Sequence, residues 1–501
     1  MSNTRPDSSQ VVFVPSGVGA VATTVQAKLR ESVSVLDFGA ISGGTAAANT
    51  VAIQAAIDYA APLGKSVFIP AGTYSITVLT IPPQHGGVEI YGEAYNSIYN
   101  LSIGTYVGTN LVSTTTTGNV ISCDGGAFYS NRGIRIGNLS ISATTSGNLI
   151  HLVGSPELTQ LTNITGYQQG TGCGFYIKDC WSGLSIDGCH LNGALAGSTG
   201  ITVINTISAG QYYIGNGTQV NNFDTGIALG TSLTTIYNVL IENTAIQQTR
   251  LTGISLGAVH TVVITNTHFE FNTGPSISKS AFGAATSVNI ESNSFYRNGT
   301  TKDIGISNST YYADGWSICN NNFAGISDGV TAISSSNAAF NSGVISNNYF
   351  IGYAGTTVGI NLGAVAGPNW TVSNNQFSSV TTPVVNSTLI GLYIQNSGIY
   401  SAITTTQVKT ANGALVAVPT ATPTTIFNAT AKGVYQVYAY YLGASAAAYS
   451  ASAVVHSTEG NVKITATNGT NMTLTASGTN IQVTHTVGSN IDLPYVYLKI
   501  A

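Results

Sequence analysis

Hydrophobic and polar residues alternate in short runs that recur at a near-constant interval between residues 118 and 386. One column of recurring positions is apolar, and its members stand 23 to 29 residues apart. A period of this length, built from β-branched runs without helical spacing, predicts a solenoid of strands. The column consists of Ile121, Ile150, Phe175, Ile201, Ile227, Ile254, Ile277, Ile306, Ile333, Ile360 and Val385.

A six-residue box, apolar-x-Asn-x-x-apolar, forms a second column in the same stretch and is clearest in ITNTHF, 264–269, and ISNNYF, 345–350. Asn suits a left-handed corner, and its amide can bond to the Asn of the next turn, about 4.8 Å away. We expect positions one, three and six to point inward and positions two, five and seven to face solvent. Ten boxes predict a parallel β-helix roughly 48 Å long. Their first positions are Ile136, Leu161, Ile186, Ile214, Ile241, Ile264, Ile290, Ile318, Ile345 and Val372.

The segments on either side of the repeats have different patterns. Residues 49–61, NTVAIQAAIDYAA, have helical spacing with Asn49 at the N-cap, which predicts a helix that closes one end of the solenoid. Residues 65–76 return to strands, and alternation of period two after residue 400 predicts an antiparallel β-sandwich. The predicted fold is therefore all-β: a right-handed parallel β-helix with an N-terminal capping helix and a C-terminal β-sandwich. The predicted domains are 1–34, 35–400 and 401–501.

Charged residues make up only 7% of the chain, against roughly 25% in a typical globular domain. Stacked turns explain this, because a column of like charges at strand spacing is destabilising. With 15 Lys+Arg, 19 Asp+Glu and no basic run, the chain is not expected to bind nucleic acid. It shows no stretch of about 20 apolar residues and no secretory signal, so we expect synthesis in the cytoplasm and no membrane insertion. Five cysteines without paired spacing predict reduced thiols rather than a disulfide framework or zinc site.

The run VFVPSGVGAVATTVQAKLRESVSVLDFGA, 12–40, resembles the N-terminal segment of many phage tail fibres and tailspikes. The segments SVLDFGA, VAIQAAIDYA and SVFIPAGTY are similar to the start of the pectate-lyase-like β-helix of phage capsule depolymerases. The resemblance implies a homotrimer in the virion tail. It also implies attachment to the tail or an adaptor protein through residues 1–34, and recognition or cleavage of a bacterial capsule, O-antigen or exopolysaccharide. The calcium-binding Asp cluster and catalytic Arg of true pectate lyases have no match, so no cofactor is expected.

Scarce carboxylates on solvent-facing box positions are the candidates for catalysis. Glu242 and Glu291 are expected two turns apart, about 10 Å, with His268 and Glu270 on the turn between them. Inverting glycosidases hold two carboxyl groups roughly 6.5–9.5 Å apart, so this spacing favours inversion. A second group lies on the turn into the first column, where Arg could grip a sugar and Tyr could stack on it. The candidate catalytic residues are Glu242, Glu270, Glu291 and Asp224, and the candidate substrate-binding residues are Arg250, His268, Tyr296, Arg297 and Asp303.

Several alternatives remain open. Exposed carboxylates often only solvate a surface, and Tyr212–Tyr213 and Tyr311–Tyr312 with Trp316 could be sugar platforms or trimer contacts. The histidines lack a third ligand, so no metal site is expected. The sequence favours an endo-acting polysaccharide depolymerase, with hydrolysis preferred to β-elimination because basic residues are few. The alternatives are a non-catalytic receptor-binding tail fibre and a polysaccharide lyase.

Overall fold

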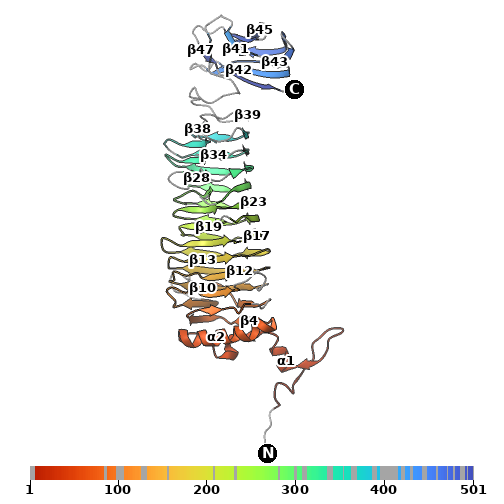
Figure 1. Ribbon diagram of the computed structural model, residues 1–501, viewed down its shortest axis with the longest axis vertical. Coiled ribbons are helices and arrows are strands. Elements are labelled where there is room, and N and C mark those ends of the chain that lie inside the picture. Colours follow the sequence, from red (N-terminus) through yellow and green to blue (C-terminus); the bar gives the residue numbers. More distant parts are fainter. Residues whose placement is uncertain are drawn as a thin grey trace, which may run out of the picture.

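The chain forms a rod of parallel strands stacked turn upon turn, with a group of antiparallel strands near the C-terminus (Figure 1). No helix in the part of the chain described below is long and apolar enough to cross a membrane. The computed structural model describes residues 6–83, 87–96, 107–125, 133–154, 157–206, 209–230, 234–279, 283–297, 302–306, 313–335, 342–353, 355–362, 369–385 and 392–394, and the strands between 416 and 499.

A complete turn of the rod contributes one strand to each of three columns, here called sheets X, Y and Z. Sheet X contains β3 (Val33–Ser34), β4 (Ser66–Ile69), β7 (Glu89–Gly92), β10 (Arg135–Ala143), β12 (Gln160–Gln168), β14 (Leu184–Asp187), β17 (Ala209–Gly215), β20 (Ile236–Glu242), β23 (Val259–Thr265), β26 (Ala285–Glu291), β30 (Trp316–Cys319), β33 (Ser342–Ser346), β36 (Asn369–Ser373) and β39 (Leu392–Ile394).

From β10 to β37, the second strand of a turn follows a corner that begins with a residue of positive φ. Sheet Y contains β5 (Gly72–Ile76), β8 (Thr109–Ser113), the second halves of β10 and β12, β15 (His190–Gly193), β18 (Gln219–Asn221), β21 (Ala245–Gln247), β24 (His268–Glu270), β27 (Ser294–Tyr296), β31 (Asn322–Ile326), β34 (Tyr349–Gly352) and β37 (Gln376–Ser378).

The third strand closes the turn. Sheet Z contains β6 (Leu79–Thr80), β9 (Ile121–Asp124), β11 (Ile150–Val153), β13 (Cys173–Lys178), β16 (Thr199–Ile204), β19 (Thr225–Leu229), β22 (Thr252–Leu256), β25 (Ile277–Lys279), β28 (Lys302–Ile306), β32 (Thr331–Ser335), β35 (Val358–Asn361) and β38 (Thr382–Val385).

The strand register confirms all ten predicted first positions of the box, which pair one above the other from β10 to β36. The apolar column on sheet Z is wrong at two places. Ile304, not Ile306, pairs with Ile277, and Val384, not Val385, pairs with Ile360. The turns differ in length, so a nearly constant spacing cannot choose between apolar residues one or two positions apart.

The third position of the box forms the predicted left-handed corner, and its φ is positive in all ten copies. Its predicted inward direction is wrong: Asn266 is exposed, whereas the next residue, Thr267, is 1% exposed. The left-handed backbone turns the corner side chain outward and brings position four into the core. One pair of corner residues does bond as predicted, since Asn163 Nδ2 donates to Asn138 Oδ1 over 3.1 Å.

A buried ladder of asparagines therefore occupies position four in the upper part of the rod. Asn321 Oδ1 accepts the backbone N–H of Asn293 and its Nδ2–H, both over 3.0 Å. Asn321 itself bonds to Asn348 in the same way, and Asn348 to Asn375. At position six, a continuous stack of aromatic rings lies 4.6–4.8 Å apart and nearly parallel. Its members are Phe269, Phe295, Phe323, Phe350 and Phe377.

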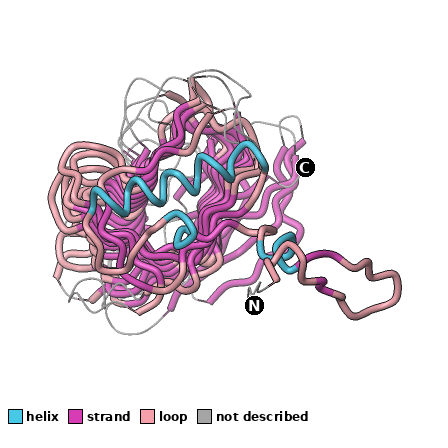
Figure 2. The backbone as a smooth tube through the Cα atoms, turned by 90° about the horizontal axis from the view of Figure 1, so that it is seen from below, coloured by secondary structure: helices cyan, strands magenta, loops and turns pink. Residues whose placement is uncertain are grey.

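Helix α2 (Ala46–Ala60) lies across the lower end of the rod, as Figure 2 shows, which confirms the predicted capping helix. It buries Ile53 and Ile57 against the core. The helix begins earlier than predicted, because the Thr45 hydroxyl accepts the Ala48 N–H and serves as the N-cap. Asn49 is instead buried inside the helix and bonds to the backbone of Ile41. The N-terminal hairpin β1 (Val12–Phe13) and β2 (Thr23–Thr24), with α1 (Val25–Leu29), projects sideways.

The strands beyond residue 415 pair antiparallel, as predicted. Their packing as a sandwich stays a prediction, and the predicted boundary at residue 400 lies outside the described residues. One sheet has the order β44-β43-β42-β48, a second has the order β41-β46-β45, and β40 pairs with β47. These strands are β40 (Val416–Val418), β41 (Thr424–Asn428), β42 (Gly433–Leu442), β43 (Ala448–Thr458), β44 (Asn461–Thr470), β45 (Met472–Ser477), β46 (Asn480–His485), β47 (Ile491–Leu493) and β48 (Tyr495–Lys499).

Candidate functional site

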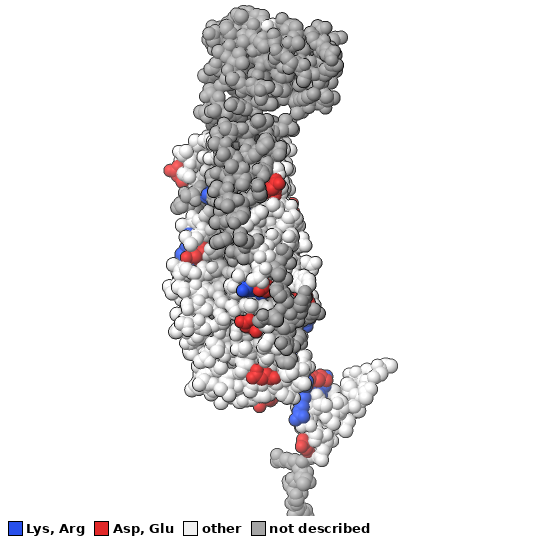
Figure 3. Space-filling view, in the orientation of Figure 1, with Lys and Arg blue, Asp and Glu red and all other residues white. Residues whose placement is uncertain are grey.

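Charged side chains are sparse on the face of the rod shown in Figure 3, where most of the described surface is uncharged. A row of acidic residues nevertheless follows one outward column of sheet X. Glu242 pairs with Thr265, and Thr265 pairs with Glu291, which confirms the predicted register of these two carboxylates. Two strand spacings separate them, about 10 Å along the rod.

The same column continues downward from Glu242 to Gly215 and then to Asp187. Tyr213 folds over this part of the column, because a β-carbon built on Gly215 would lie 2.5 Å from its hydroxyl oxygen. Burial, a hydrogen bond to Glu242 and the negative charges of Glu242 and Asp187 raise the pKa of Tyr213. The phenol therefore stays protonated at neutral pH and lies between two carboxylates on alternate turns.

One carboxylate oxygen of Asp187, Oδ1, is buried and accepts no hydrogen bond in the described part of the chain. Unsatisfied buried oxygens are uncommon and are often explained by function. The box pattern puts Asp187 at a solvent-facing second position, but Asp187 is not among the predicted catalytic residues, and Tyr213 was predicted only as a sugar platform or trimer contact. The sequence signal for this contact is Gly215, which stands in the acidic column two residues after the outward Tyr213. It can be recognised only when the pairing of the strands is known.

Glu270 lies on sheet Y, beyond the corner at Asn266, and not in the acidic column of sheet X. Its Oε2 accepts the Gln247 amide N–H over 2.8 Å and lies 3.4 Å from His268 Nε2. The structure thus brings together the predicted pair His268 and Glu270. It does not pair Glu270 with Glu242 among the contacts of the described residues.

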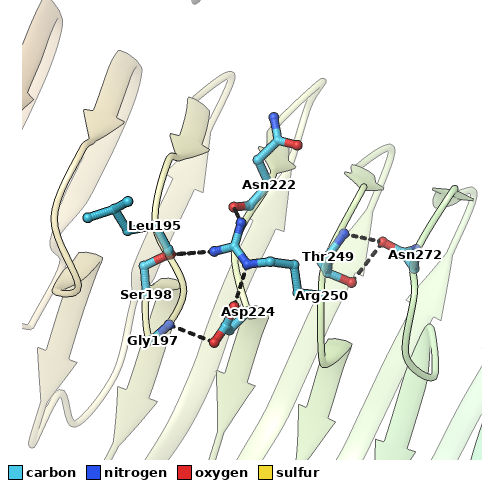
Figure 4. A network of polar contacts seen from close by, with 8 residues as sticks. All are labelled: Leu195, Gly197, Ser198, Asn222, Asp224, Thr249, Arg250 and Asn272. Atoms are coloured by element: carbon cyan, nitrogen blue, oxygen red, sulfur yellow. Dashed lines mark hydrogen bonds and ion pairs between the residues drawn. The ribbon is translucent and has the colours of Figure 1, made fainter.

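The predicted second group separates into parts, of which the first is the pair Asp224 and Arg250 (Figure 4). Arg250 Nε donates to Asp224 Oδ1 over 2.5 Å, and Asp224 Oδ2 accepts the Gly197 N–H over 2.6 Å. Arg250 also donates through Nη1 to the carbonyl of Asn222 over 2.5 Å, and through Nη2 to Leu195. The arginine thus ties together three successive turns. Its predicted role in binding sugar, like the catalytic role of Asp224, stays a prediction.

Arg297 and Tyr296 lie further up the rod, at the end of β27. The Arg297 guanidinium carbon lies 5.2 Å from the centre of the Tyr296 ring and 5.1 Å from that of Tyr353. Phe271 packs edge-on against Tyr296 at 6.1 Å. Asp303 belongs to neither part, since it is 4% exposed on sheet Z beside Ile304.

Other predicted features are placed as follows. Tyr212 and Trp316 are buried in the core, and Tyr311–Tyr312 lie outside the described residues. All five cysteines are free thiols. Within the described residues, no group of three His, Cys, Asp or Glu side chains is placed to hold a metal ion.

Comparison with known proteins begins with the sequence. A family model described as rhamnogalacturonase A/epimerase, pectate lyase-like, matches residues 32–254. A search of curated proteins finds no match.

Among solved structures, the catalytic unit of the GH87 α-1,3-glucanase of Streptomyces thermodiastaticus has a TM-score of 0.50 and 14% identity, covering 78% of this chain and 71% of that chain. The tailspike gp49 of Acinetobacter baumannii bacteriophage Fri1, a capsular polysaccharide depolymerase, has a TM-score of 0.43 and 12% identity, covering 99% and 90%. The tailspike of E. coli bacteriophage HK620, solved with a pentasaccharide, has a TM-score of 0.45 and 13% identity, covering 98% and 96%.

At such identities the likeness concerns the fold, and the glucanase agrees with the parallel strand register described above. Residues 32–254 match the pectate-lyase-like family of rhamnogalacturonase A and epimerases, and the chain is a right-handed parallel β-solenoid whose structural neighbours include phage tailspikes, one of them a capsular polysaccharide depolymerase.

Proposed function

We propose that the protein is a phage tailspike that binds and depolymerises a bacterial surface polysaccharide by hydrolysis. The observation that carries this proposal is the arrangement of Asp187, Tyr213 and Glu242 on sheet X. Two carboxylates on alternate turns flank a phenol on a face that is otherwise poor in charge. Such pairs of carboxyl groups are what glycoside hydrolysis requires.

The geometry suggests a role for each group. Glu242 accepts a hydrogen bond from the Tyr213 hydroxyl, and we assign Glu242 as the base that activates water. Asp187 lies two strand spacings below, and we assign it as the acid that protonates the leaving glycosidic oxygen. A separation of about 10 Å between the strands is close to the roughly 6.5–9.5 Å of inverting enzymes. Glu291, equally far on the other side of Glu242, is the alternative partner.

The phage context rests on residues 12–40, which resemble the N-terminal segment of tail fibres and tailspikes. Attachment to the tail or an adaptor protein, location in the virion tail and assembly as a homotrimer belong to the same proposal. A homotrimer would present three copies of the binding face in one spike, which would raise the avidity for a repetitive polysaccharide.

The test is cleavage of capsule or O-antigen by the purified protein, followed by detection of new reducing ends and by mass spectrometry. We expect Glu242→Gln and Asp187→Asn each to lower kcat by about 10²–10⁴-fold, because each removes a proton-transferring group. Glu89→Gln is the matched control, since Glu89 is also on sheet X but bonds to Ser66.

Other outcomes would change the proposal. Binding without cleavage on a verified host polysaccharide would favour the receptor-binding fibre. Unsaturated products would favour the lyase. A loss in Glu291→Gln but not in Asp187→Asn would move the acid to the other side of Glu242.

A further inference from the structure

Two arginines that the sequence groups together have opposite surroundings. Each side-chain nitrogen of Arg250 donates to a protein oxygen: Nε to Asp224, Nη1 to Asn222, and Nη2 to Leu195 and Ser198. Arg297 makes no side-chain hydrogen bond or ion pair within the described residues. Its contacts there are with two aromatic rings. Among the described residues, the N–H donors of Arg297 are therefore left without a protein acceptor and can bind a ligand.

The backbone and a glycine set the direction of Arg297. Its φ of 47° places it at the left-handed corner after β27. The next turn has Gly325 at the equivalent place, and a β-carbon there would lie only 3.1 Å from Arg297 Cγ. The missing side chain leaves a path along the rod, by which the guanidinium reaches Tyr353 one turn further on.

Two aromatic rings lie near the guanidinium of Arg297. Tyr296 and Tyr353 both lie close to its carbon atom, and cation–π contacts of this kind are worth about 0.5–1 kcal/mol each at exposed sites. Tyr353 is 69% exposed and Phe271 is 46% exposed, so both rings offer apolar area to a ligand. The acidic neighbour on this face, Glu270, is engaged by Gln247 and His268.

We infer that Arg297, with Tyr296, Tyr353 and Phe271, forms a subsite for a carboxylate-bearing sugar of the polysaccharide. A planar guanidinium binds a carboxylate through two parallel hydrogen bonds, which a lysine cannot reproduce. The exposed rings pack against the sugar. This inference rests on the proposed function, because it assigns the acidic repeat unit of the same polysaccharide.

The test is binding of the full-length Glu242→Gln protein to an array of acidic and neutral bacterial capsular and O-antigen polysaccharides. The strongest binder is then compared with its carboxyl-reduced derivative by calorimetry. We expect the bound polysaccharides to carry carboxylates. We also expect Arg297→Gln to weaken binding at least about 10-fold and Arg297→Lys several-fold. Arg135→Gln, which removes an exposed arginine of β10 that contacts no aromatic ring of the described residues, should change binding less than about 2-fold.

Carboxyl reduction should weaken wild-type binding as much as Arg297→Gln does, and combining the two should add little. The inference would be overturned by strong binding to neutral polysaccharides or by no binding to any polysaccharide. It would also be overturned if Arg297→Gln weakened binding to the carboxyl-reduced polysaccharide as much as binding to the unreduced one. Unchanged melting temperatures show that the variants fold. Binding without cleavage by the wild type would leave this subsite standing and remove the proposed enzyme. Cleavage at the same rate by wild type and Arg297→Gln would support the proposed enzyme and remove this subsite.

Discussion

The lower and upper halves of the rod fill the same two core positions with different chemistry. At position four the lower turns carry Leu139, Ile164 and Cys189, whereas the upper turns carry the asparagine ladder from Asn293 onward. Thr244 and Thr267 occupy this position in two of the turns between. At position six the lower turns carry aliphatic residues such as Leu191 and Ile246, and the upper turns carry the phenylalanine stack.

This difference separates the most regular part of the core from the proposed catalytic residues Asp187 and Glu242. The acidic column with Tyr213 lies mostly on the less regular turns, at and below the point where the ladders begin. Identical stacked residues suit a uniform rod, in which each turn supports its neighbours. The less regular turns can carry side chains that are not repeated, and here Gly215 leaves room for Tyr213 to contact Glu242. The comparison predicts that stability depends most on the repeated residues of the upper half.

The largest effect is expected in the aromatic stack. Phe323→Ala removes a ring packed between Phe295 and Phe350, and should lower the free energy of unfolding by about 3–5 kcal/mol. Ile246→Val, at the same position in the lower half, should cost only about 0.5–1.5 kcal/mol. Chemical denaturation followed by circular dichroism measures both. Equal losses of unfolding free energy per unit of side-chain volume removed would show that the aromatic stack contributes no more than the aliphatic positions below it.

A somewhat smaller effect is expected in the asparagine ladder. Asn321→Ala leaves the backbone N–H and the amide of Asn293 without their acceptor in a buried site, which should cost about 2–3 kcal/mol. Thr244→Val, at position four below the ladder, keeps the shape and removes one hydroxyl that bonds to the carbonyl of Glu242. Its loss should be about 1 kcal/mol. The same unfolding experiment tests the pair, and a greater loss in Thr244→Val would contradict the ordering.

The smallest effect concerns alkaline pH and the lower half. Burial raises the pKa of Cys189 to about 12, from an ordinary value near 9. The unfolded thiol loses its proton first, so the stability from this group is complete below pH 9 and is lost progressively toward pH 12. Cys189→Ala should therefore lose about 1 kcal/mol less stability than the wild type between pH 8 and pH 10. Parallel stability profiles for the two proteins would show that the thiol titrates equally when folded and unfolded.

The fold was largely predictable because stacking repeats the same physical requirement at every turn. The first box position and the left-handed corner each follow from one residue type recurring at one interval. The direction of the corner side chain was not predictable, because Asn320, Asn321 and Asn322 are adjacent and identical in type. The backbone angle decides that the second of them faces the core.

The candidate site was less predictable, because turns of unequal length move residues out of line. Sequence offsets grouped Arg297 with Arg250, although they lie at different places in their turns. Asp303 was predicted to belong with them and is instead buried on sheet Z. The contact of Tyr213 with the acidic column depends on the bare Gly215, which no periodic pattern marks.

The asparagine ladder also has a consequence for how the chain folds. Each amide is completed only when the next turn docks, because Asn293 needs Asn321 and Asn321 needs Asn348. A partly formed upper half therefore always ends in a buried polar group that lacks its acceptor. The lower turns, with Leu139 and Ile164 at this position, carry no such penalty. We expect the rod to nucleate in its lower half and to grow toward the C-terminus. The asparagine turns should form together, because each needs the next one as a hydrogen-bond partner.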